Sequence, residues 1–166
     1  MTSFKLRLLA VFSVLVLFLS ITPAVFAESP ESFGLTPQNT LPGSSGYLFK
    51  RAKEKVAEKF KFSKNSKYEY RKWLLERRVS EYVSLVEKNE QTQISDASQR
   101  LAFEAGILAE SSITESKEKK SEIISLFEKY KPILGKMRDN FPANTPYWLL
   151  SQQDVDTMDI LTEKLK

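Results

Sequence analysis

The chain has 166 residues and a formal net charge of +4, and it contains neither cysteine nor histidine. The lack of cysteine excludes disulfides, thiol nucleophiles and thiolate metal sites. The lack of histidine excludes serine–histidine catalysis and removes the commonest metal ligand. Catalysis by carboxylates or lysines stays open on composition alone, but no spacing of these residues indicates it.

Residues 1–27 are typical of an export signal. A basic start precedes an uncharged apolar run from Leu8 to Ile21, and modest-sized residues ending at Ala27 offer a cleavage site. The run is shorter than the roughly 20 residues that span a bilayer. We therefore expect cleavage after Ala27 and a secreted, periplasmic or cell-envelope protein. The alternative is an uncleaved membrane anchor, because the next charge after the run is Glu28.

Residues 28–46 contain three prolines and three glycines and few side chains that could pack. This composition is typical of a flexible linker. We expect it to separate the signal segment from a folded domain at residues 47–166.

The first helix is expected from Tyr47 onward. Phe49, Ala52, Val56 and Phe60 recur at steps of three and four residues and share one face. That face is predicted to pack against the rest of the domain, with lysines on the sides and back of the helix.

Two further helices are expected in the middle of the chain. The second begins at Ser66, where Ser66-x-x-Glu69 resembles a capping box, and ends near Asn89. Its apolar face is formed by five residues: Leu75, Val79, Tyr82, Val83 and Val86. The third covers about 92–112 and is apolar on two sides, as a central helix would be.

The fourth helical segment is expected at about 115–131, either separate from the third or continuous with it. Pro132 is expected to end or kink it. A last helix follows Thr145-Pro146, which supplies a cap and a proline at the first helical position. The sequence thus predicts an all-α bundle of about four to five helices, built on antiparallel pairs.

The entry to the domain carries an unusual pattern, Pro42-Gly43-x-x-x-Tyr47-x-Phe49-Lys50-Arg51-x-x-Glu54-x-Val56, followed by Glu76-Arg77-Arg78 and Glu81. These residues, from Pro42 to Glu81, resemble a bacterial exported family of unknown function with a helical domain after a signal or transmembrane segment. The family usually has leucine where Phe49 stands. The resemblance implies an extracytoplasmic helical domain, but no activity, cofactor or catalytic residue.

Positive charge is concentrated in one part of the chain. Residues 50–78 contain 12 basic and 4 acidic residues, whereas residues 79–166 contain 11 basic and 15 acidic ones. The basic segment is a candidate site for an anionic membrane surface or wall polymer. Its candidate residues are Lys50, Arg51, Lys55, Lys59 and Lys61. The alternative is a solvated face, and nucleic acid is disfavoured because no base-reading motif is present.

Two further groups of residues stand out. Glu54 is expected to pair with Arg77 or Arg78 when the first two helices fold together; the alternative is a local pair of Arg77 with Glu81. The large aromatics Trp73, Tyr147 and Trp148 form either a groove for a sugar polymer or partner helix, or a contact that docks the tail onto the bundle near Trp73.

These observations favour a non-enzymatic, exported cell-envelope protein that acts as a protein-interaction or scaffold module, with another envelope protein as its partner. The alternative is a membrane-surface or wall-polyanion-binding module that uses residues 50–78. No metal or cofactor site is expected, and the sequence leaves the oligomeric state open.

Overall fold

A computed structural model describes residues 27–166, so the predicted signal segment lies outside the described residues except for Ala27. The helical elements are η1 (Pro30–Phe33), α2 (Tyr47–Lys59), α3 (Lys64–Glu87), η2 (Gln91–Gln93), α4 (Ile94–Ser112), α5 (Lys117–Arg138) and α6 (Pro146–Leu165). No strand occurs in this part of the chain. The all-α prediction is confirmed.

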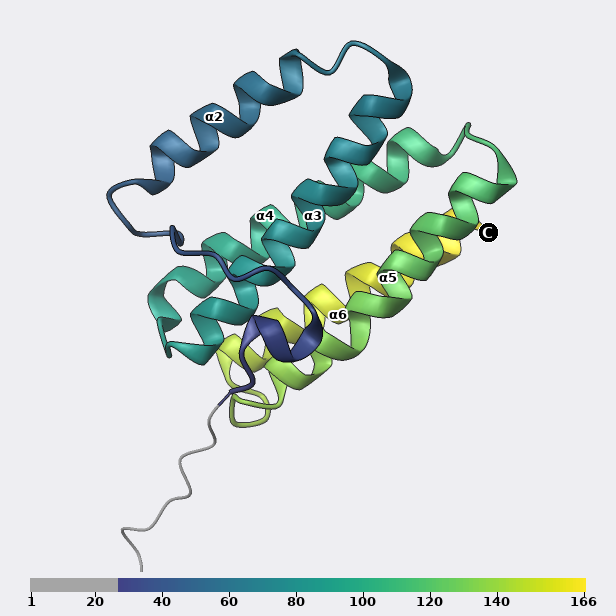
Figure 1. Cartoon of the computed structure of the whole chain (residues 1–166). Helices are drawn as coiled ribbons and strands as arrows, with labels where there is room; N and C mark the ends of the chain where they lie inside the picture. The colour runs from purple at the N-terminus through teal and green to yellow at the C-terminus, as the bar shows by residue number, and fades with distance from the viewer. Residues whose placement is uncertain (1–26) are drawn as a thin grey trace, which may run out of the picture.

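Helices α3 to α6 form a bundle (Figure 1). Helix α3 packs against α4, α4 against α6, and α6 against α5, with smaller contacts of α5 to α3 and α4. The interior is apolar, and its largest fully buried side chains include Tyr82, Leu101, Phe127, Tyr130 and Met158. Short turns join α3 to α4 and α5 to α6, so the predicted antiparallel pairs are confirmed.

Two helices, α3 and α6, begin at a side-chain cap. Helix α3 begins earlier than the sequence motif suggested, because its cap is Ser63, three residues before Ser66. The Ser63 hydroxyl oxygen accepts a hydrogen bond from the Ser66 backbone N–H at 3.0 Å. The prediction of Ser66 as the cap is therefore wrong, since Ser66 lies inside the first turn. Thr145 caps α6 ahead of Pro146 as predicted.

The chain turns between α4 and α5, so these are two separate helices. Helix α5 continues through Pro132 to Arg138. Of the two predicted effects of Pro132, an end or a kink of the helix, the end is therefore wrong. Proline inside a helix costs about 3 kcal/mol. Burial of Ile133, Leu134 and Met137 beyond the proline opposes that cost and favours continuation of the helix.

The segment at residues 28–46 is packed onto the bundle, contrary to the expectation that little in it could pack. Leu35 and Leu41 are buried in the core, and the Ser80 hydroxyl donates a hydrogen bond to the Thr36 carbonyl at 2.6 Å. Gly43 has a φ of +88°, and a Cβ there would lie 2.7 Å from the side chain of Gln93. The segment at residues 28–46 therefore follows one ordered path over α3, and Gly43 allows a turn in that path that a larger residue would block.

Helix α2 lies outside the bundle, beside α3 (Figure 1). The prediction that its apolar face packs inward is wrong: Phe49, Val56 and Phe60 are 66%, 54% and 68% exposed. The buried residues of α2 are instead Tyr47 and Glu54, on the opposite side of the helix. This orientation follows from polar contacts between α2 and α3.

Candidate functional site

The inward face of α2 meets a buried acid of α3. Glu81 is fully buried, and its carboxylate accepts a hydrogen bond from the Tyr47 hydroxyl at 2.8 Å. The Nζ of Lys50 lies 2.6 Å from Glu81 Oε1, and Arg78 Nη1 lies 2.8 Å from the same oxygen. Glu81 is therefore held by one hydroxyl and two cations.

Arg78 connects this acid to a second one. Its Nη2 donates to Glu54 Oε2, and both side chains are more than nine-tenths buried. Arg77 Nε lies 3.4 Å from the other Glu54 oxygen. The structure thus brings Glu54 together with both arginines, while Glu81, the alternative partner of Arg77, is occupied by Arg78. We call Tyr47, Lys50, Glu54, Arg77, Arg78 and Glu81 the junction network.

Burial and charge act on the acid–base properties of this network. Burial and then the negative charge of Glu81 raise the pKa of Tyr47 to about 12, so the phenol stays neutral. Burial lowers the pKa of Lys50, and Glu81 opposes that effect. Burial would lower the pKa of Arg78 too, but Glu81 and Glu54 outweigh it and raise the pKa. Arg78 therefore stays charged.

Lys50, a candidate for binding polyanions, is turned into the protein. Besides its contact with Glu81, its Nζ donates hydrogen bonds to Gln38 Oε1 at 3.0 Å and to the Thr40 carbonyl at 2.9 Å. These three contacts occupy the three N–H donors of the Lys50 ammonium group, and two of them connect α2 to the segment at residues 36–40. Gln38 and Thr40 were not identified from the sequence. Tyr47 and Glu81 belonged to the entry pattern, but their contacts with each other and with Lys50 were not predicted.

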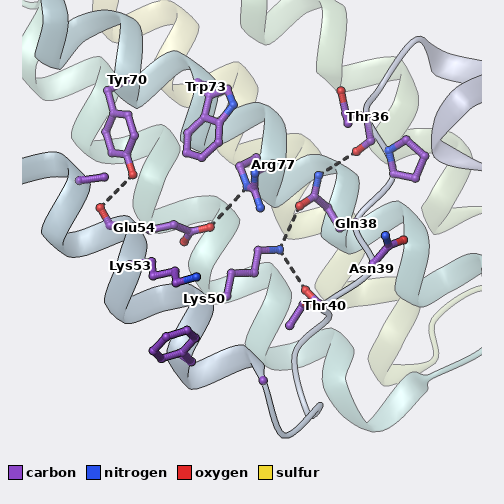
Figure 2. Close-up of a pocket in the computed structure, with 14 residues that line it drawn as sticks. Thr36, Gln38, Asn39, Thr40, Lys50, Lys53, Glu54, Tyr70, Trp73 and Arg77 are labelled. Atoms are coloured by element: carbon purple, nitrogen blue, oxygen red, sulfur yellow. Dashed lines mark hydrogen bonds and ion pairs between the residues drawn. The ribbon is translucent and has the colours of Figure 1, made fainter.

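An open cleft of about 670 Å³ lies beside the network, between residues 36–40, α2 and α3 (Figure 2). Trp73 and Tyr70 stack in its wall with ring centroids 5.1 Å apart, and the Arg77 guanidinium lies 4.5 Å from the Trp73 ring. The Tyr70 hydroxyl donates to the Glu54 carbonyl at 2.8 Å, which fixes the aromatic pair to α2.

Two polar side chains of the cleft wall face each other, with Arg77 Nε 3.4 Å from Glu54 Oε1. Glu54 Oε1 and Arg77 Nε are buried, and neither makes a hydrogen bond within the described residues. Lys53 also lines the cleft, with its Nζ 4.6 Å from the Phe49 ring and no ion pair in the described part of the chain. The cleft therefore combines apolar ring surfaces with three cations, Lys50, Lys53 and Arg77, and one acid, Glu54.

The remaining candidates lie apart from the cleft. Arg51, Lys55, Lys59 and Lys61 form no ion pair among the residues that the structure describes, and Lys61 lies 5.4 Å from the Tyr70 ring. Tyr147 contacts Phe141, and Trp148 contacts Arg138 and packs against the core. The tail is thus docked on the bundle by α6, with no aromatic contact to Trp73 within residues 27–166.

The described residues contain neither a cluster of metal ligands nor a membrane-spanning helix. Between residues 27 and 166, no group of three or more acidic side chains is placed to hold a metal ion. No helix in the same range is long and apolar enough to cross a bilayer.

The fold and the cleft define an all-α domain in which a four-helix bundle carries an additional helix through buried ion pairs. The chain belongs to the family described as "Domain of unknown function (DUF5667)", whose model matches residues 39–164. No curated protein and no solved structure matches the chain. The matched range includes α2, the junction network and most of the residues that line the cleft.

Proposed function

We propose that this protein is a non-enzymatic interaction module of the cell envelope, and that the cleft beside α2 binds an acidic segment of another envelope protein. The observation that supports this most directly is the pairing of Trp73 with Arg77 in an open cleft. Tryptophan and arginine are enriched where proteins concentrate binding energy.

The charge balance of the cleft favours an acidic ligand. Glu54 is neutralised by Arg78, and Lys50 is neutralised by Glu81. Arg77 also lies 3.4 Å from Glu54, so the three cations of the network meet two acids. With Lys53, which forms no ion pair within the described residues, a net charge of +2 is left for a ligand. A carboxylate can accept hydrogen bonds from Arg77, while an adjacent apolar side chain covers Trp73 and Phe49.

The assignment as non-enzymatic rests on the same pairing. Glu54 is the acid that lines the cleft, and its two carboxylate oxygens are taken up by contacts with Arg78 and Arg77. We infer that its task is structural.

We infer a role for the pattern at the domain entry as well. Tyr47, Lys50, Glu54, Arg78 and Glu81 all belong to that pattern, and all meet in the junction network. Together they fix the side of α2 that faces α3 and thereby keep the cleft open. Export, and with it an extracytoplasmic location, is proposed from the signal-like residues 1–27.

The cleft can be tested by tryptophan fluorescence, because the chain has two tryptophans and Trp148→Phe leaves Trp73 as the reporter. We would titrate this variant with the peptide Ac-Gly-Glu-Phe-Gly-NH₂ and with the same peptide carrying glutamine in place of glutamate. We expect a saturable change in Trp73 emission with the acidic peptide and at least tenfold weaker binding of the neutral one.

Arg77→Gln in the same background should weaken binding of the acidic peptide by tenfold or more. Arg138→Gln is the matched control, because Arg138 likewise lies over the aromatic ring at position 148, which is a phenylalanine in this background, away from the cleft. Equal binding of the two peptides, or an unchanged affinity in Arg77→Gln, would reject the acidic-ligand proposal.

A further inference from the structure

The outward face of α2 is an apolar strip in contact with solvent. Phe49, Ala52, Val56 and Phe60 lie along it at helical spacing and are exposed. Leu48 and Phe62 extend it on both ends, with 78% and 82% of their surface exposed. Solvent-facing apolar side chains are common singly, but a continuous strip on one helix indicates a surface that binds something.

Lysines flank the strip, and both acidic residues of α2 point away from it. Helix α2 has two acidic residues: Glu54 pairs with Arg78, and Glu58 lies 2.9 Å from the Arg71 guanidinium. Both glutamates therefore face α3, where arginines bind their carboxylates. Lys53, Lys55 and Lys59 remain exposed, and none forms an ion pair within the described residues. The outward half of α2 presents apolar and positively charged groups only.

We propose that α2 lies in the plane of an anionic bilayer surface, with Phe49, Val56 and Phe60 inserted among the lipids. Helices that bind at this interface combine an apolar face with lysines along its border, and the lysines contact lipid phosphates. Arg71 and Arg78 of α3 favour this orientation, because they bind the two glutamates of α2, which the lipid phosphates would otherwise repel.

The charge distribution favours a bilayer over a second copy of the chain. A two-fold dimer through the same face would place the lysines of one helix against those of its partner. The interaction would then bury like charges, which is unfavourable. An anionic lipid surface satisfies the apolar strip and the lysines at once.

This surface differs from the cleft, although the two meet at Phe49 and Lys53. The cleft opens on one flank of α2 and continues onto α3 through Trp73 and Arg77. Val56 and Phe60 do not line the cleft. Variants at Val56 and Phe60 therefore report on the bilayer proposal, and variants at Trp73 report on the cleft.

The absence of cysteine in the chain allows a site-specific fluorescence test. We would place an environment-sensitive NBD label at Val56→Cys or Phe60→Cys in the full chain. Ser125→Cys on the exposed side of α5 is the control. Each protein would be reconstituted with vesicles of phosphatidylcholine alone, or of phosphatidylcholine with 30% phosphatidylglycerol. The full chain keeps residues 1–26 the same in every sample.

We expect the labels at positions 56 and 60 to shift to shorter emission wavelength and to resist aqueous quenching in the anionic vesicles. The label at position 125 should stay accessible in both. Each lysine at an anionic surface is worth about fivefold in binding. Lys53→Gln, Lys55→Gln and Lys59→Gln together should therefore lower the ratio of shielded to accessible label by about a hundredfold. Lys117→Gln, Lys120→Gln and Lys129→Gln on α5 form the matched control and should leave this ratio unchanged.

Three results would overturn the proposal. Labels at positions 56 and 60 could stay as accessible as the label at 125. Shielding could be equal in neutral and anionic vesicles. Shielding could also arise without vesicles as the protein concentration rises, which would identify a second copy as the occupant. Trp73→Ala, which alters the cleft outside the junction network, should leave the labels unaffected, so the bilayer and cleft proposals can fail separately.

Discussion

The α3–α6 bundle and the junction of α2 with α3 are held together by opposite chemistry. In the bundle, apolar faces meet, and side chains such as Leu101, Phe127 and Met158 are fully buried. At the junction, charged side chains are buried while the apolar face of α2 remains in water. An amphipathic pattern therefore specifies which residues share a side of a helix, but not which side faces inward.

The two kinds of contact also differ in what they provide. Burial of apolar surface gives net stability in proportion to its area. A buried ion cluster gives little net stability compared with an apolar contact, but removal of one partner is costly. The bundle therefore accounts for the stability of the fold, and the junction network for the orientation of α2. The following predictions test this division of roles, beginning with the largest effect.

Arg78→Ala is expected to have the largest effect, because it leaves Glu54 and Glu81 in a buried site without their shared cation. The cost is about 3–5 kcal/mol. We expect it to emerge as release of α2 before the bundle unfolds. Hydrogen exchange should show lost protection for amides of residues 47–59, with protection in α4 and α6 largely kept.

The double variant of Glu54→Ala and Arg78→Ala tests whether these residues act as a pair. If they do, the double variant costs much less than the sum of the two single changes. Additive costs would show that Arg78 stabilises α2 by some route other than its contact with Glu54.

Leu101→Ala should destabilise the bundle by about 3 kcal/mol, since it creates a cavity at a fully buried position. In contrast to Arg78→Ala, all helices should lose protection together. Urea unfolding followed by circular dichroism should show a single transition at a lower midpoint with an unchanged slope. Selective release of α2 in this variant would contradict the assignment of roles.

Asp154 is an exception to the apolar chemistry of the bundle. It is 1% exposed and accepts a hydrogen bond from Ser98 at 2.8 Å, while its other oxygen has no hydrogen-bond partner in the described residues. Burial raises the pKa of Asp154 to about 7, and the Ser98 hydrogen bond opposes this. Burial, and then the negative charge of Asp154, also raise the pKa of Tyr82.

The sign of the effect follows from the raised pKa. Between about pH 4 and pH 7 the folded state holds a proton that the unfolded state has released, so the contribution of Asp154 to stability falls as the pH rises. Asp154→Asn should remove this slope and stabilise the fold by on the order of 2 kcal/mol above pH 7. Asp156→Asn, on the exposed side of α6, is the control in urea unfolding at pH 5 and pH 8.

The parts of the fold that the sequence predicted correctly depend on neighbours along the chain. Thr145-Pro146 marks the start of α6 by local chemistry, and the spacing of Leu75, Val79 and Tyr82 marks the buried face of α3. The extent of α5 was missed at Pro132, because packing of later residues outweighs a local preference. The ordered path of residues 28–46 was missed for the same reason.

The candidate site depends on contacts between distant residues. The Tyr47 hydroxyl and Glu81 are 34 positions apart, and their contact decides which side of α2 faces inward. One signal was present in the sequence: Arg78 falls among the apolar residues of α3, where a charge must find a partner. The resemblance supplied Glu54 as that partner, but nothing local indicated the cleft wall at residues 36–40.

The smallest effect on stability is expected from substitutions in the apolar strip of α2. A comparison with the same residue type in the bundle core shows the difference between the two regions most directly. Phe60→Ser should change the free energy of unfolding by no more than about 0.5 kcal/mol, because the ring is already in water. Phe127→Ala, the same aromatic residue at a fully buried position, should cost about 3–5 kcal/mol. Urea unfolding of the two variants in parallel measures the difference. A large loss in Phe60→Ser would mean that the face packs against the protein in solution, and the bilayer proposal would lose its basis.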